Sequence, residues 1–95
     1  MTPKFKAQAG TFESSDIMIL IEPVEQGTGL QVDISSTVML QFEEDIKTTV
    51  NQVLKDLDIK DVHLIAKDKG ALTPTIKARV ETAVKRSLGI QEGTM

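Results

Sequence analysis

The chain has 95 residues, of which 40% are hydrophobic and 26% charged, with a net charge of −3 and no cysteine. This length favours one domain over residues 1–95, with flexible ends at residues 1–9 and 90–95. A chain without cysteine has no disulfide framework and no thiolate metal ligands. Without a basic stripe and interleaved aromatic residues, nucleic-acid binding is not expected.

The hydrophobic residues do not form a membrane segment. The longest apolar run, residues 17–21, is far shorter than the roughly 20 residues that cross a bilayer. The first residues carry positive charge, but no apolar stretch of a secretory signal follows them. We therefore expect a cytoplasmic protein that does not contact the membrane.

Charge is distributed unevenly along the chain. Residues 1–46 hold two lysines against eight acidic residues, whereas residues 47–95 hold nine basic residues against six acidic ones. One interpretation is that the acidic half, with Glu13, Asp16 and Glu22, steers the protein to basic surfaces on its partners. The alternative is that these charges only form a solvated surface.

The first half of the chain has the pattern of strands. Residues 4–9 alternate weakly between apolar and polar until Gly10, and residues 17–24 are rich in long and β-branched aliphatic side chains. Residues 25–29 have turn composition, and residues 30–35 alternate cleanly. We expect the second and third of these strands to pair as an antiparallel hairpin.

The second half adds two helices and a strand. An apolar face at helical spacing follows Ser35, Ser36 and Thr37, which are candidate N-caps. The members of that face are Phe42, Ile46, Val50, Val53, Leu54 and Leu57.

Residues 62–67 alternate as a further strand. Thr73 and Pro74 then begin a second helix that ends at Gly89. The order ββαβα predicts an α+β fold, with a small mixed or antiparallel sheet of three or four strands and two helices packed on one face.

The sequence has little equipment for catalysis. His63 is the only histidine, and on the outward face of a strand we assign it no role. No metal-ligand spacing and no Ser-His-Asp arrangement can be recognised. One serine stands out, because Ser14 lies with Ser15 between the carboxylates of Glu13 and Asp16, just before an apolar strand. Without further information, such a serine is usually a turn or capping residue.

A longer pattern around this serine resembles the acyl carrier (gamma) subunit of citrate lyase. The resemblance covers roughly residues 10–89 in one register. It is carried by Gly10-Thr11-Phe12-Glu13-Ser14-Ser15-Asp16, Met18 and Ile19, Pro23, Ser35-Ser36 and Val38, Gln41-Phe42, Thr48-Thr49, and Asp68-Lys69-Gly70-Ala71-Leu72.

The resemblance implies a non-catalytic carrier domain with a covalent prosthetic group. In that family the serine after the glutamate, here Ser14, bears 2'-(5''-phosphoribosyl)-3'-dephospho-CoA, whose thiol holds acetyl or citryl as a thioester. Ser15 stands where family members often have glycine, so two adjacent hydroxyls compete for the assignment. Because Glu13 and Asp16 would repel a phosphodiester, we expect an exposed linkage.

The resemblance also implies partners. These are the alpha and beta subunits of citrate lyase, which exchange acetyl for citryl and cleave the citryl thioester, together with a prosthetic-group transferase and an acetylating ligase. Two alternatives remain open at this point: the carrier subunit of malonate decarboxylase, and an unmodified α+β interaction domain. The loop of Asp68, Lys69 and Gly70 is either near the arm or only a polar turn.

Overall fold

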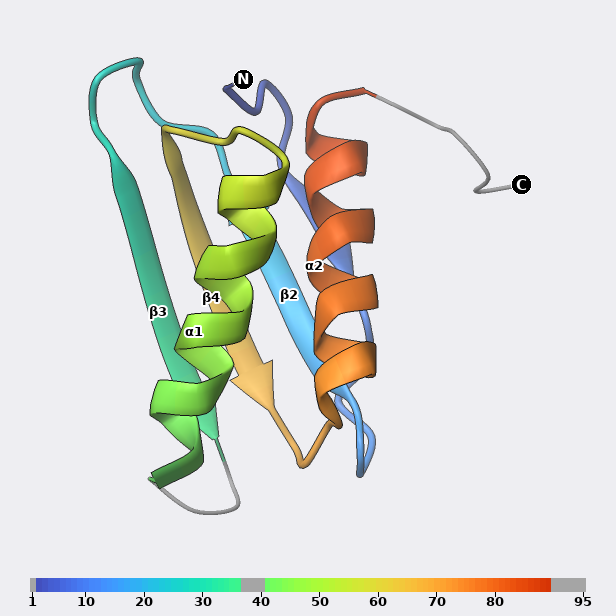
Figure 1. The fold of residues 1–95 in the computed structure, drawn as a ribbon. Helices are drawn as coiled ribbons and strands as arrows, with labels where there is room; N and C mark the ends of the chain where they lie inside the picture. Colours follow the sequence, from blue (N-terminus) through green and yellow to red (C-terminus); the bar gives the residue numbers. More distant parts are fainter. Residues whose placement is uncertain (1, 37–40, 90–95) are drawn as a thin grey trace.

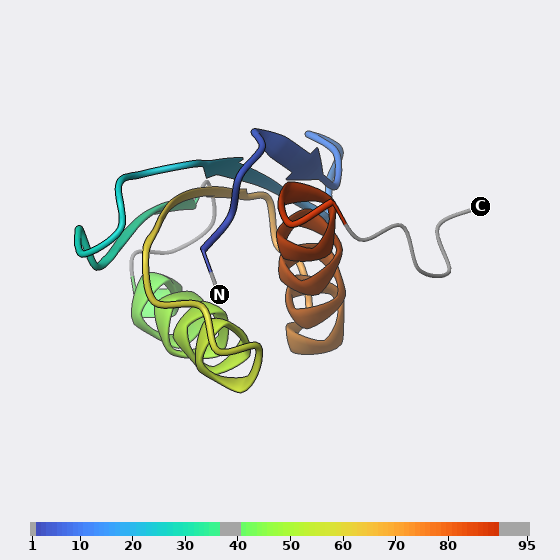
Figure 2. The same ribbon diagram turned by 90° about the horizontal axis from the view of Figure 1, so that it is seen from above.

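The computed structural model describes residues 2–36 and 41–89, which form four strands and two helices. The elements are β1 (Ala7–Ala9), β2 (Ile17–Glu22), β3 (Leu30–Ser36), α1 (Gln41–Asp56), β4 (Val62–Asp68) and α2 (Thr73–Ser87). Both helices pack on one face of a single mixed sheet, which confirms the predicted α+β class (Figures 1 and 2). The order is βββαβα, since the weak alternation before Gly10 does form an edge strand.

The predicted hairpin between β2 and β3 is wrong. The strand order is β1-β2-β4-β3, so β4 lies between them, antiparallel to β2 and parallel to β3. Strand β3 reaches β4 through α1, the crossover that a parallel pair requires. The connection between β2 and β3 is therefore a wide loop, and Asp61 Oδ1 fastens it by accepting hydrogen bonds from the backbone N–H groups of Gly27 and Gly29.

The core lies between the sheet and the helices. The apolar face predicted for the first helix is confirmed at Ile46, Val50, Val53 and Leu54, whereas the side chain of Phe42 lies outside the described part of the molecule. Burying each large aliphatic side chain contributes about 1.5–3 kcal/mol. The buried residues that face one another are Ile17, Ile19 and Ile21 of β2, Val62, Leu64 and Ala66 of β4, the four from α1, and Ile76, Val80, Ala83 and Val84 of α2.

The ends of the helices match the sequence only in part. Ser35 and Ser36 belong to β3, so their predicted role as N-caps is wrong, and the Ser36 hydroxyl instead donates to Asp68 Oδ2 at 3.0 Å. Thr37 and residues 90–95 lie outside the described residues. The second helix begins at Thr73 with Pro74 in its first turn, and Gly89 follows its end at φ +81° as expected for a helix terminator.

Several segments that are far apart in the sequence lie together at one end of the sheet. The loop of residues 10–16, the carboxyl ends of β3 and β4, and the first turns of α1 and α2 all lie at the lower end in Figure 1. The loop of residues 23–29 lies at the opposite end. Within the described residues, neither helix is long and apolar enough to span a bilayer.

Candidate functional site

Ser14 is exposed on the loop of residues 10–16, here called the serine loop. The loop turns at Gly10, which adopts φ +96°. A Cβ atom at this position would lie 1.8 Å from the carbonyl oxygen of Ile17, so no side chain fits. The sequence left open whether Gly10 only ends a strand; the structure shows that the return of the chain into β2 requires glycine here.

Asp16 fixes the other end of the serine loop. Its carboxylate accepts hydrogen bonds from the Thr11 hydroxyl and the Ile17 N–H, both at 2.7 Å. The Arg79 guanidinium on α2 donates two more, at 3.1 Å from Nε and 3.0 Å from Nη2. Burial alone would raise the pKa of Asp16, but these hydrogen bonds, with the charge of Arg79, lower the pKa to about 2.

Backbone hydrogen bonds join the serine loop to the loop between β4 and α2. The Ser15 N–H donates to the Lys69 carbonyl at 2.7 Å, and the Lys69 N–H donates to the Asp16 carbonyl at 2.9 Å. The polar turn around Lys69 therefore supports the serine loop directly. Gly70 has φ +96°, as expected for the polar turn that was one of the two interpretations of this loop.

The two serines differ in backbone conformation rather than in exposure. Ser15 has φ +66°, in the left-handed region where glycine is favoured, and glycine is the residue that the resemblance leads us to expect there. Both side chains are exposed. Exposure alone does not distinguish the two hydroxyls as attachment points.

The prediction of an acidic docking patch is wrong for Asp16. That carboxylate is only 9% exposed and is paired with Arg79, so it is not available to a partner. Glu13 and Glu22 are exposed, but Glu22 ends β2 at the opposite end of the sheet from the serine loop. Of these three acidic residues, Glu13 is therefore the one that remains exposed on the serine loop.

His63 lies on the uncovered face of the sheet, as predicted. Its Nε2 is 2.8 Å from Asp33 Oδ2 and its Nδ1 is 3.5 Å from Glu22 Oε2. These contacts connect neighbouring strands and are remote from the serine loop. In the described residues, no group of three or more histidines and carboxylates is arranged to bind a metal ion.

Sequence reasoning missed two residues of the site, Thr11 as a hydrogen-bond donor and Arg79 as the partner of Asp16. Arg79 lies 63 positions from Asp16 in the sequence, and nothing local in α2 indicates its partner. The only available signal was the position of Arg79 beside the apolar face of the predicted second helix.

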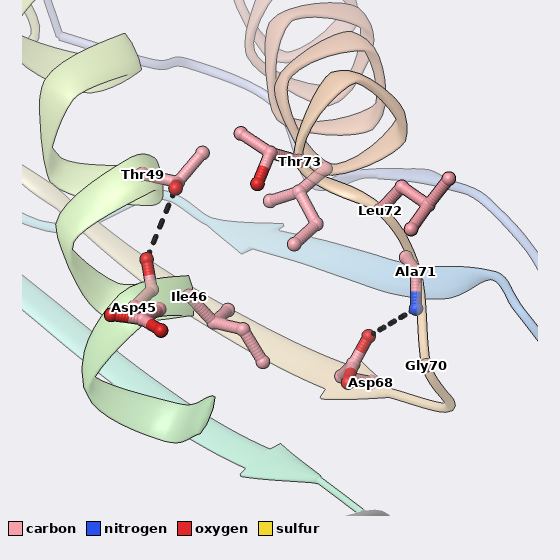
Figure 3. Close-up of a pocket in the computed structure, with 9 residues that line it drawn as sticks. Asp45, Ile46, Thr49, Asp68, Gly70, Ala71, Leu72 and Thr73 are labelled. Carbon is pink, nitrogen blue, oxygen red and sulfur yellow. Dashed lines mark hydrogen bonds between the residues drawn. The ribbon is translucent and has the colours of Figure 1, made fainter. Parts of the chain in front are cut away.

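A pocket of about 420 Å³ opens between the two helices at the same end of the molecule. Figure 3 shows α1 on one side and, on the other, the turn that leads from Asp68 into α2. Asp68 is buried, and its Oδ1 accepts a hydrogen bond from the Ala71 N–H at 2.9 Å, which holds the turn in place.

Comparison with known proteins gives consistent matches over nearly the whole chain. A family model described as ACP, malonate decarboxylase delta subunit (MdcD), matches residues 4–87. In the fold comparison, a crystal structure of a Pseudomonas malonate decarboxylase hetero-tetramer in complex with malonate matches with a TM-score of 0.71 and 18% identity, over 90% of this chain and 87% of the other.

Several curated citrate lyase acyl carrier proteins are closer in sequence. The protein from Latilactobacillus sakei is 49% identical over 90% of this chain and 83% of its own length. Those from Treponema denticola and Halothermothrix orenii are 44% and 40% identical, over 92% and 97% of this chain and 97% of each relative. The chain therefore belongs to the citrate lyase acyl carrier protein family, whose members are carriers and not catalysts.

Proposed function

We propose that this chain is the acyl carrier subunit of a citrate lyase complex and that Ser14 bears its prosthetic group. The group is 2'-(5''-phosphoribosyl)-3'-dephospho-CoA, joined through a phosphodiester to the Ser14 oxygen. When attached, it supplies a terminal thiol that holds acetyl or citryl as a thioester. The chain itself positions the arm and presents it to its partners in turn.

The observation that carries this proposal is an exposed hydroxyl on a loop fixed at both ends. Gly10 allows the sharp return into β2, and the Asp16–Arg79 pair ties the loop to α2. Between them, Ser14 is exposed to a modifying enzyme. A tethered arm needs such a rigid base, because the carrier must present the thiol repeatedly from one place.

The charges around Ser14 suit a phosphodiester better than the sequence suggested. Arg79 neutralises Asp16, so of the two carboxylates only Glu13 remains to repel a phosphate. The exposed Lys69 lies in the adjoining loop, whose backbone is hydrogen-bonded to Ser15 and Asp16, so a positive charge is available at this end of the molecule.

The relatives favour citrate over malonate as the origin of the acyl group. Identity is 40–49% to the curated citrate lyase carriers cited above and 18% to the malonate decarboxylase chain. We therefore propose the citrate lyase alpha and beta subunits as partners, with a transferase that attaches the group and a ligase that acetylates it. The site of action is the cytoplasm.

The test is a reconstituted citrate lyase complex with two serine variants. We expect Ser14→Ala to abolish citrate cleavage while changing stability by no more than about 0.5 kcal/mol, because the side chain is exposed. Ser15→Ala serves as the matched control and retains activity. If Ser15→Ala were the inactive variant, or if Ser14→Ala unfolded several degrees earlier, the assignment of Ser14 as the attachment point would be wrong.

A further inference from the structure

The pocket between α1 and α2 is held next to the serine loop. Its rim includes Asp68 and Gly70, and the residue between them, Lys69, makes the two backbone hydrogen bonds that join the β4–α2 turn to the serine loop. A group attached to Ser14 therefore starts beside the pocket. Figure 3 shows that the pocket lies over the carboxyl end of β4.

The lining of the pocket is apolar at its base and polar at its edges. Ile46 and Ile76, each 4% exposed, contribute from the two helices, and Leu72 is 74% exposed at the turn. Thr49 and Thr73 add hydroxyl groups. The Thr49 hydroxyl donates to the Asp45 carbonyl at 3.0 Å, which leaves its oxygen able to accept a hydrogen bond.

The charged side chains that line the pocket in the described residues are carboxylates, Asp45 at the edge and Asp68 beneath the turn. Such a pocket accepts a neutral ligand with methyl or methylene groups and amide N–H donors. It disfavours an anionic ligand, because a second negative charge would be partly desolvated beside Asp45. The volume of about 420 Å³ suits one end of an arm rather than a whole nucleotide.

We propose that this pocket is the resting site for the uncharged acetyl-pantetheine end of the arm, and that the citryl form is kept out by its carboxylates. The proposal rests on the attachment of the arm at Ser14. Because the arm is tethered beside the pocket, its local concentration is in the millimolar range, and weak affinity is enough. The acetyl thioester is then sheltered from water, whereas the citryl thioester extends toward the cleaving subunit.

Two small probes test the pocket on the unmodified full-length protein. S-acetyl-pantetheine and S-succinyl-pantetheine differ at the acyl end by one carboxymethyl group, which adds a negative charge. We expect the acetyl probe to shift the backbone amide NMR signals of Ala71 and Thr73, with a dissociation constant at least fivefold lower than that of the succinyl probe. Equal affinities, or shifts confined to other surfaces, would overturn the proposal.

Two pairs of variants connect the binding to the pocket. Thr49→Phe fills the space and should weaken acetyl-probe binding at least tenfold. Thr48→Phe should leave it unchanged, since Thr48 makes the equivalent bond to the Glu44 carbonyl but does not line the pocket. Asp45→Asn should restore binding of the succinyl probe, whereas Glu44→Gln, one residue away, should not. If the two threonine variants behaved alike, the pocket would not be the binding site. If Asp45→Asn and Glu44→Gln behaved alike, the carboxylates of the pocket would not exclude the citryl form.

The proposed resting site and the proposed attachment at Ser14 can be refuted independently of each other. A carrier with an adduct on Ser14 that does not bind the acetyl probe would refute the resting site and leave the proposed function intact. A native carrier without the adduct would refute the proposed function, and the arm could no longer be the occupant even if the probe bound.

Discussion

Each end of the sheet has a loop fastened by one buried aspartate, but the two fastenings differ in kind. Asp61, just before β4, accepts hydrogen bonds from the backbone N–H groups of Gly27 and Gly29, so neutral donors fasten the loop of residues 23–29. Asp16 binds the Thr11 hydroxyl and the Arg79 guanidinium of a distant helix. The serine loop is thereby fixed to the body of the domain, as the base of a swinging arm requires.

The glycines of the two loops show the same contrast. A Cβ atom at Gly27 or Gly29 would meet nothing within 4 Å, although both residues have positive φ. At Gly10 a Cβ atom would collide with backbone. The loop of residues 23–29 therefore has space around its glycines, whereas the serine loop is packed against the strand that follows it.

Gly10→Ala is expected to have the largest effect on stability. It combines a left-handed backbone with a collision against the Ile17 carbonyl, so we expect a loss of about 3–4 kcal/mol. Gly27→Ala is the control, with a similar φ but open space, and should cost about 1 kcal/mol. Denaturant unfolding of both variants measures the difference, and equal losses would mean that the serine loop is no more tightly packed than the other loop.

Arg79→Met should come next, at about 1–3 kcal/mol, because it leaves the Asp16 carboxylate buried without its counter-charge. Lys85→Met removes the exposed ion pair with Glu81, which is also short at 2.8 Å, and should cost no more than about 0.5 kcal/mol. Thermal unfolding at pH 7 compares the two. A similar loss of stability in both variants would mean that the Asp16–Arg79 pair contributes no more than an exposed ion pair.

The pKa of Asp16 predicts a smaller effect at acidic pH. Since folding lowers this pKa from 3.8 to about 2, the carboxylate stabilises the fold above pH 4, and that contribution disappears as the pH falls from 4 to 2. We expect this contribution to the free energy of unfolding to be about 1–2 kcal/mol, because the half-exposed Arg79 is partly screened by solvent. The stability difference between the natural protein and Asp16→Asn should therefore shrink over this range. A constant difference would show that Asp16 is not ionised in the way described.

The smallest expected effect is on docking. With Asp16 buried, Glu13 is the acidic residue left exposed on the serine loop, and Glu22 lies at the other end of β2. Glu13→Gln should slow association with the partner subunits about two- to threefold at low salt, whereas Glu22→Gln should not. Stopped-flow association at several ionic strengths measures both rates. Identical salt dependence for the two variants would assign Glu13 to the solvated surface.

Much of the fold could be predicted because its signals are local. The helices follow from apolar spacing, the start of α2 from Thr73 and Pro74, and the strands from alternation. The partner of each strand could not be predicted in this way, because alternation fixes which face is buried but not which strand lies alongside. The parallel pairing of β3 with β4 depends on the crossover through α1.

In the candidate site, too, local features could be predicted from the sequence, whereas contacts between distant segments could not. Ser14 was recognisable from a contiguous pattern, although that pattern left open whether position 10 requires glycine. The pairing of Asp16 with Arg79 and the pocket between α1 and α2 were not, because each joins segments far apart in the chain. Such contacts arise only when the sheet has placed the helices side by side.

Intact-mass measurement of the carrier purified from its native source, followed by peptide mapping, determines whether Ser14 carries the arm. We expect a mass increase equal to the phosphoribosyl-dephospho-CoA group, located on the peptide that contains residues 10–16, with fragment ions placing it on Ser14 and leaving Ser15 unmodified. An unmodified mass in an active complex, or an adduct on Ser15, would contradict it.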